Sequence, residues 1–336
     1  MLSVYGFPFM LAMFVSFVLT PYIKKLAFKI GAVDKPDNRK VHKRIMPRLG
    51  GLAIYIAFMI AVVAGMEMSL DIFGILLGGT VIVALGVADD VYQLPAKVKL
   101  LGQIVAAGIL VAFDIRIEWV NNPLGGYFYL DMLSMPFTIF WVISFINVVN
   151  LIDGLDGLAA GVSAIASLTV ILVAIQMGYF HVAVLTAALA GAIIGFIRYN
   201  FNPATIFMGD TGSMFIGYIL AAISVYGAVK TAATIALIVP AIALGLPILD
   251  TAFAIMRRYV NGRPIFQPDK GHLHHRLLAT GMSHKETVLF MYGITAVLCI
   301  GAVLWAEMDG VYAALIIAVI MTAVAIGAKK IGILND

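Results

Sequence analysis

Long apolar segments recur along the whole chain and constrain its fold more than any other feature. A helix that spans a bilayer needs roughly 20 largely apolar residues. Eleven segments qualify: 4–23, 49–66, 70–88, 98–113, 135–152, 157–177, 181–199, 212–229, 232–256, 286–305 and 310–328. Of the 336 residues, 62% are hydrophobic and 12% are charged, whereas a soluble domain has about 45–50% apolar and about 25% charged residues. The sequence therefore predicts an all-α polytopic membrane protein with about eleven transmembrane helices, in which residues 1–336 form a single integral membrane domain.

The lysines and arginines predict how these helices are oriented. Cytoplasmic loops of membrane proteins carry an excess of basic residues. With the loop after the first helix in the cytoplasm, 20 of the 22 basic residues are cytoplasmic, and only Arg116 and Lys230 lie outside. We therefore expect a multi-pass protein of the cell inner (plasma) membrane, with its N-terminus outside and its C-terminus in the cytoplasm. The sequence has no basic domain with a folded surface for nucleic acid, so we expect no nucleic-acid partner.

The outer segment near 115–130 is less apolar than its neighbours. Residues 115–119 alternate between apolar and polar side chains, and residues 123–126 read Pro-Leu-Gly-Gly. Alternation followed by turn residues is typical of a β-hairpin. We expect a small exterior β-hairpin here.

Acidic, amide and imidazole side chains gather in four clusters at predicted helix ends. Ionisable groups at membrane depth are costly, so they indicate function by default. The clusters are Asp89 and Asp90; Asn150, Asp153 and Asp156; Asn200 and Asp210; and His272, His274 and His275, followed by Arg276. The orientation assigned from lysine and arginine alone places all four on the cytoplasmic face. We expect them to converge on one cleft that takes a soluble anion from the cytosol and an amphiphile from the bilayer.

Each cluster also has a purely structural interpretation. Asp156 or Asp210 could cap a helix, the Asp89–Asp90 pair could belong to a solvated turn, and the histidine segment could be a solvated basic loop or a zinc site. Asp250, inside the ninth predicted span, is either a buried structural partner or part of the wall of the site. A prenyl-diphosphate aspartate motif is excluded, because Gln93 stands where that pattern needs its third aspartate.

Five strings, in order over residues about 40–280, resemble the polyprenyl-phosphate N-acetylhexosamine-1-phosphate transferase superfamily. They are residues 47–51 (PRLGG), 88–90 (ADD), 150–157 (NLIDGLDG), 207–213 (FMGDTGS) and 272–275 (HLHH). The branch that makes the peptidoglycan lipid precursor has three consecutive histidines in the last string, whereas Leu273 interrupts them here. The chain looks more like the branch that transfers GlcNAc-1-phosphate to undecaprenyl phosphate and initiates teichoic-acid or O-antigen assembly.

This resemblance implies an enzyme that converts UDP-GlcNAc and undecaprenyl phosphate into undecaprenyl-diphosphate-GlcNAc and UMP, with Mg²⁺ (or Mn²⁺) as the metal. Such an enzyme catalyses the first membrane step of cell-envelope glycopolymer synthesis, and a homodimer is a further expectation. Asp210 matches the metal-binding aspartate, and Asp89 and Asp90 match the catalytic acidic pair. Substrate-binding positions are matched by Lys43, Lys99, Asn150, Asp153, Asp156, Asn200, His272, His274, His275 and Arg276.

The residues leave alternatives open for mechanism and for function. When two polyanions react, metal and cationic groups must offset their repulsion. Asp90 could position or deprotonate the lipid phosphate, or the reaction could proceed through an aspartyl-phosphate. The donor could be another UDP-N-acetylhexosamine or UDP-muramoyl-pentapeptide. Two other function classes also fit many apolar spans: a secondary transporter of an anionic metabolite and a non-catalytic lipid-binding scaffold.

Overall fold

The computed structural model describes residues 2–34, 44–121, 126–231, 235–260 and 272–307, together with Pro36, Gly262 and Thr322. Most of these residues are helical. The helices are α1 (Leu2–Ile30), α2 (Gly50–Gly65), α3 (Leu70–Tyr92), α4 (Ala96–Ala112), α5 (Ser134–Ile152), α6 (Leu158–Gln176), α7 (Phe180–Asn200), α8 (Gly209–Thr231), α9 (Ile235–Ala243), α10 (Gly245–Val260), α11 (Leu273–Ala279) and α12 (His284–Glu307). Short elements complete them: η1 (Asp131–Leu133), β1 (Val33–Asp34), β2 (Met46–Pro47), β3 (Trp119–Asn121) and β4 (Tyr127–Tyr129).

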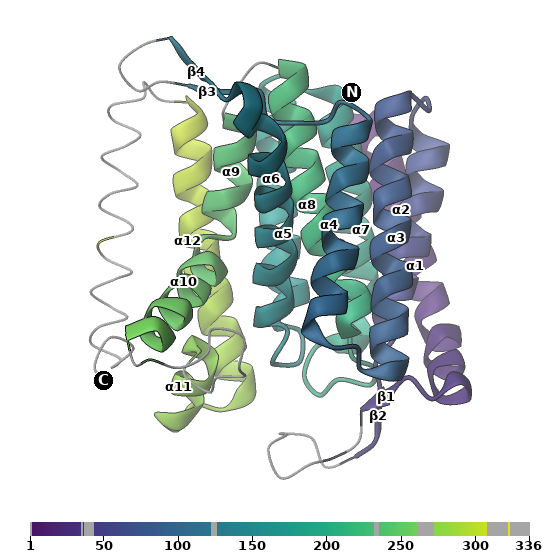
Figure 1. The fold of residues 1–336 in the computed structure, drawn as a ribbon. Helices are drawn as coiled ribbons and strands as arrows, with labels where there is room; N and C mark the ends of the chain where they lie inside the picture. The colour runs from purple at the N-terminus through teal and green to yellow at the C-terminus, as the bar shows by residue number, and fades with distance from the viewer. Residues whose placement is uncertain are drawn as a thin grey trace.

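The long helices lie side by side in one bundle, with α8 among the others (Figure 1). This helix packs against α2, α3, α5 and α9, and nearly all of its apolar length is buried. It runs antiparallel to α3, because Lys230 near its end forms an ion pair with Asp71 at the start of α3. The start of α8 therefore lies beside the end of α3, at the end of the bundle that carries β1, β2 and α11.

Length and composition make this bundle a membrane domain. In the described residues, seven helices are long and apolar enough to cross a bilayer, and the bent pair α9–α10 brings the number to eight. Helices α2 and α4, with 16 and 17 residues, occupy the predicted spans 49–66 and 98–113 but are shorter than those seven helices. The predicted span 310–328 lies outside the described residues, apart from Thr322. The chain is a polytopic membrane protein, as the sequence predicted.

The ninth predicted span, 232–256, differs from the expectation of one continuous helix. Helices α9 and α10 are bent by 74° relative to one another at a break around Leu244. Pro247 follows the last residue of α9 by four positions. A proline ring clashes with the carbonyl four residues before it and provides no N–H, so a helix breaks there. The break turns α10, and with it Asp250, away from the line of α9.

Two small hairpins lie at opposite ends of the helix bundle (Figure 1). Strands β3 and β4 pair antiparallel with Trp119 opposite Tyr129, which confirms the hairpin predicted near 115–130. Strands β1 and β2 also pair, and the sequence analysis missed this hairpin because each strand has two residues. Arg48, directly after β2, then forms a parallel bridge with Phe207, just before α8.

Two glycines allow close packing around the start of α8. A Cβ on Gly51 of α2 would lie 2.5 Å from the carbonyl carbon of Thr211. A Cβ on Gly86 of α3 would lie 2.7 Å from the backbone nitrogen of Thr211. Small residues let membrane helices approach closely enough for backbone contact. The position of the first turn of α8 is therefore set by α2 and α3 together.

Candidate active site

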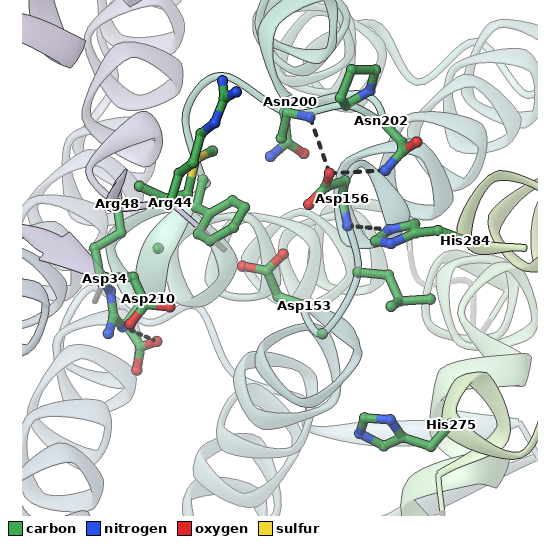
Figure 2. A pocket seen from close by; sticks show the side chains of 17 residues that line it. Asp34, Arg44, Arg48, Asp153, Asp156, Asn200, Asn202, Asp210, His275 and His284 are labelled. Atoms are coloured by element: carbon green, nitrogen blue, oxygen red, sulfur yellow. Dashed lines mark hydrogen bonds and ion pairs between the residues drawn. The ribbon is translucent and has the colours of Figure 1, made fainter. Parts of the chain in front are cut away.

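A cavity of about 670 Å³ opens at the end of the bundle where α8 begins. Figure 2 shows its walls, with Arg48, Asp34 and Asp210 on one side and His284 and His275 on the other. The charged, amide and imidazole residues that line it are Asp34, Arg44, Arg48, Asp153, Asp156, Asn200, Asn202, Asp210, His275 and His284. They come from five parts of the chain, so the cavity exists only when the bundle is assembled.

The Asp90 carboxylate, behind this cavity, holds the start of α8. Its side chain is completely buried. It accepts hydrogen bonds from Asp210 N (3.0 Å), Thr211 N (3.1 Å) and Thr211 Oγ1 (2.6 Å). Helix starts have unpaired N–H groups that acidic side chains satisfy well. The side chain of Asp90 therefore caps α8 from a neighbouring helix, and it fixes the backbone of Asp210.

Two cations bridge the carboxylates next to this cap. Arg48 Nε donates to Asp90 Oδ1 (2.9 Å), and Arg48 Nη2 lies 3.4 Å from Asp210 Oδ1. Lys99 Nζ lies 3.1 Å from Asp89 Oδ2 and 2.9 Å from Asp210 Oδ2. The other oxygen of Asp89 accepts from Leu94 N (2.7 Å). Ionised groups this deeply placed persist only when they are paired, and here two cations face three carboxylates.

Asp153 differs from these three aspartates because no lysine or arginine of the described residues forms an ion pair with it. Its carboxylate points into the cavity (Figure 2), and no residue in the described ranges donates a hydrogen bond to it. Burial first, and then the negative charge of Asp210, together raise the pKa of Asp153 to about 7. A cation that entered the cavity would offset both effects, because it would stabilise the ionised carboxylate.

These residues fit a divalent ion of the Mg²⁺ type. No three histidine, cysteine or acidic side chains of the described residues are close enough to hold a metal by themselves. Mg²⁺ does not need such a cage, because it takes one or two carboxylates and fills its other positions with water and substrate phosphate. The carboxylates of Asp153 and Asp210 line the same cavity. Together they would provide the carboxylate oxygens that such an ion takes from a protein.

A set of hydrogen bonds joins two loops of the cavity wall, residues 153–157 and residues 200–206. Asp156 Oδ2 accepts from Asn202 Nδ2 (3.1 Å) and Ala204 N (3.0 Å), and Asp156 N donates to His284 Nε2 (2.9 Å). Asn200 Oδ1 accepts from Gly157 N (3.1 Å). Gly157 has a φ of +78°, which a residue with a Cβ rarely adopts. Asp156 and Asn200 therefore join the 153–157 loop to the 200–206 loop.

Comparison with known proteins identifies the family. Residues 72–228 match the model of the family described as glycosyl transferase family 4. The chain is 41% identical, over 98% of its length and 92% of the relative's, to a "probable undecaprenyl-phosphate N-acetylglucosaminyl 1-phosphate transferase" of Bacillus subtilis (strain 168). The chain belongs to glycosyl transferase family 4.

Two further relatives also have the names of transferases. A decaprenyl-phosphate N-acetylglucosaminephosphotransferase of Mycolicibacterium smegmatis is 36% identical, with 87% of this chain and 79% of the relative covered. A phospho-N-acetylmuramoyl-pentapeptide-transferase of Thermoanaerobacter sp. (strain X514) is 32% identical, with 85% and 95% covered. This family 4 protein is thus an enzyme, a phosphoglycosyl transferase, as its sequence strings predicted.

The structure of this family 4 transferase brings many of the predicted residues together. Five line the cavity directly: Asp153, Asp156, Asn200, Asp210 and His275. Asp89, Asp90 and Lys99 lie behind Asp210 and are connected to it by hydrogen bonds and ion pairs. Asn150, His272, His274 and Arg276 do not line the cavity, and Asn150 instead donates to Ser213 Oγ of α8 (2.9 Å). Lys43 lies outside the described residues.

The sequence analysis assigned no role to several residues of this site. Arg48 stands inside one of the five family strings, and a single arginine between proline and two glycines was a signal that could have been used. Asp34, Arg44, Asn202 and His284 also line the cavity. Each lies in a loop or at a helix end, and nothing in its local sequence separates it from ordinary surface residues.

Proposed function

We propose that this transferase moves GlcNAc-1-phosphate from UDP-GlcNAc to undecaprenyl phosphate, with Mg²⁺ held by Asp153 and Asp210. The observation that supports this most is the cluster of two cations and three carboxylates at the same end of the membrane bundle as Asp153, which no described residue pairs with. A soluble donor and a membrane lipid can meet only at such an end. The lipid acceptor and the transferred group are those in the name of the relative from Bacillus subtilis and are adopted here for this chain.

The proposed reaction exchanges one phosphorus–oxygen bond for another. An oxygen of the lipid phosphate bonds to the phosphorus that carries GlcNAc, and the bond from that phosphorus to the bridging oxygen of the diphosphate breaks, so UMP leaves. Bound Mg²⁺ would neutralise phosphate charge and orient the two groups for in-line displacement. Lys99 and Arg48, already beside Asp210, add positive charge where the transition state gains negative charge.

We favour direct displacement over an aspartyl-phosphate intermediate. Both oxygens of Asp89 and both oxygens of Asp90 accept hydrogen bonds, and Asp90 is completely buried. A carboxylate in this state is poorly placed to attack phosphorus, because it would first have to lose donors at the cost of its charge stabilisation. Single turnover without the lipid acceptor tests this: we expect no UMP, and stoichiometric UMP would refute direct displacement.

The orientation in the membrane is part of the same proposal. With eleven spans, the N-terminus outside and the C-terminus in the cytoplasm, the cavity faces the cytosol of a bacterial plasma membrane, where nucleotide sugars are made. The basic residues at this end of the bundle support this orientation: Arg44 and Arg48 line the cavity, and Lys97 and Lys99 lie in the first turn of α4. Cysteine labelling of intact cells on the β3–β4 hairpin, which should be accessible from outside, tests it. Light scattering of the detergent-solubilised protein tests the predicted homodimer.

The decisive experiment measures UMP release by the purified protein. We expect release with undecaprenyl phosphate, UDP-GlcNAc and Mg²⁺, and much less with UDP-muramoyl-pentapeptide or other UDP-N-acetylhexosamines. Asp210→Asn should abolish release while the thermal unfolding midpoint in detergent is retained. Asp71→Asn is the matched control, because Asp71 pairs with Lys230 at the opposite end of α3 and α8. The absence of UMP with every donor, or accumulation of donor in sealed vesicles, would refute the proposal.

A further inference from the structure

Asp250 is a buried carboxylate of α10 that no step described above uses. It is 6% exposed, and it lies just after the break that separates α10 from α9. Its Oδ1 accepts a hydrogen bond from Leu273 N (2.8 Å), and its Oδ2 lies 2.9 Å from His272 Nδ1. An ionised carboxylate only accepts hydrogen bonds, so His272 donates from Nδ1. Asp250 therefore holds the start of α11 by two bonds.

The histidines of this segment extend the connection from Asp250 to the cavity. The rings of His272 and His274 are stacked, with centroids 5.9 Å apart and an interplanar angle of 7°. His274 in turn contacts His275, with ring centroids 4.2 Å apart. His274 also packs on the loop between α5 and α6, because a Cβ on Gly154 would lie 2.7 Å from His274 Nε2. Gly154 is the residue directly after Asp153.

The three histidines differ in what they can reach. His272 and His274 are 6% and 2% exposed, and neither lines the cavity. His275 does line it, across from Asp210 (Figure 2). The two buried rings therefore form a support, and His275 is the member of the segment that a ligand in the cavity can touch.

We propose that Asp250 is a positioning residue for donor binding, which acts through His272 and His274 to hold His275 and the Asp153 loop in place. The inference rests on the proposed function, because the ligand it concerns is the UDP-sugar. An asparagine at this position has one accepting oxygen and one donating amide, so either Leu273 loses its acceptor or His272 must accept at Nδ1 in its other tautomer, and in both cases the charged acceptor is lost. The rings of His272 and His274 would then be held less firmly, while the rest of the bundle is unchanged.

A double-variant cycle on the full-length protein tests this inference. We expect Asp250→Asn to raise KM for UDP-GlcNAc about tenfold, with KM for undecaprenyl phosphate and the unfolding midpoint close to those of the unmutated protein. His275→Ala should raise the same KM. The two changes combined should be no worse than the larger single effect, because residues that act through one another are not additive. Asp71→Asn serves as the control for loss of a paired carboxylate elsewhere.

Three results would overturn the inference: an unchanged KM for the donor, equal rises in both KM values, or effects that multiply in the double variant. If Asp250→Asn does not fold, His272→Gln changes the other partner of the same hydrogen bond and is measured in its place. Calorimetric binding of UDP-GlcNAc without lipid separates this inference from the proposed function. If the unmutated protein binds the donor more tightly than Asp250→Asn but releases no UMP, the function fails and the positioning role stands. If the unmutated protein binds no donor, both fail.

Discussion

A single methyl group on α3 should disable this enzyme without unfolding it. In Gly86→Ala, the new Cβ would lie 2.7 Å from Thr211 N and 3.0 Å from the carbonyl carbon of Asp210. Non-bonded carbon atoms at optimal separation are about 3.5–4.0 Å apart. Both neighbours are backbone atoms and cannot rotate away, so the first turn of α8 must shift by on the order of 1 Å relative to α3.

This shift affects the residues on which the proposed chemistry depends. Thr211 N and Asp210 N both donate to Asp90, and Asp210 pairs with Lys99 and Arg48. A misplacement of about 1 Å can lower a rate about 10²-fold, which corresponds to about 2.7 kcal/mol of lost transition-state stabilisation. We therefore expect kcat for UMP release to fall about 100-fold, against an overpacking cost to stability of about 1–3 kcal/mol.

Gly79→Ala is the matched control, on the same helix. Its Cβ would meet the end of the Phe215 side chain at 3.2 Å, and a side chain can move aside. We expect this variant to keep kcat within about threefold, because the start of α8 is unaffected. UMP release and thermal unfolding are measured for both variants in the same detergent. Equal kcat in the two variants, or activity lost from Gly86→Ala only in proportion to unfolded protein, would refute the reasoning.

Three further outcomes are expected. Chelation of divalent ions should stop UMP release, and added Mg²⁺ should restore it with no change in protein fold; release that survives chelation would contradict the metal assignment. Arg48→Gln should lower the free energy of unfolding by about 1.5–3 kcal/mol in a denaturant titration, because the buried Asp90 loses a charged donor. The control Arg116→Gln, in an exposed cluster, should lower it by less than about 1 kcal/mol. Burial, and then the charge of His275, lowers the pKa of His274 from 6.5 to about 3. The unfolded chain therefore binds this proton at a higher pH than the folded chain does. As a result, the stability that neutral His274 provides is complete above pH 6.5 and is lost as the pH falls toward 3. The unfolding midpoint of His274→Asn should fall less steeply over that pH window, and parallel curves would show that the prediction is wrong.

The membrane class, the hairpin at 119–129 and the positions of most helices followed from the sequence alone. Each depends on local information: the length of an apolar segment, the alternation of side chains or a pair of glycines. The break between α9 and α10 was missed although its cause, Pro247, is visible in the sequence, because an uninterrupted apolar composition suggested one span. The family also followed from short strings, and the relatives agree with it.

What the acidic and imidazole residues do was decided by the assembled bundle. Asp90 and Asp153 are equally plausible site residues in the sequence. In the structure, Asp90 is fully buried and accepts from four donors, whereas Asp153 faces the cavity and accepts from no described residue. Arg48 lies 42 positions from Asp90 and 162 from Asp210, and the parallel bridge to Phe207 brings it to both. A hydrogen bond or an ion pair depends on distances of a few ångströms between segments far apart in the chain. Local composition carries no record of those distances, so only the packing of α2, α3 and α8 could assign each carboxylate its partner.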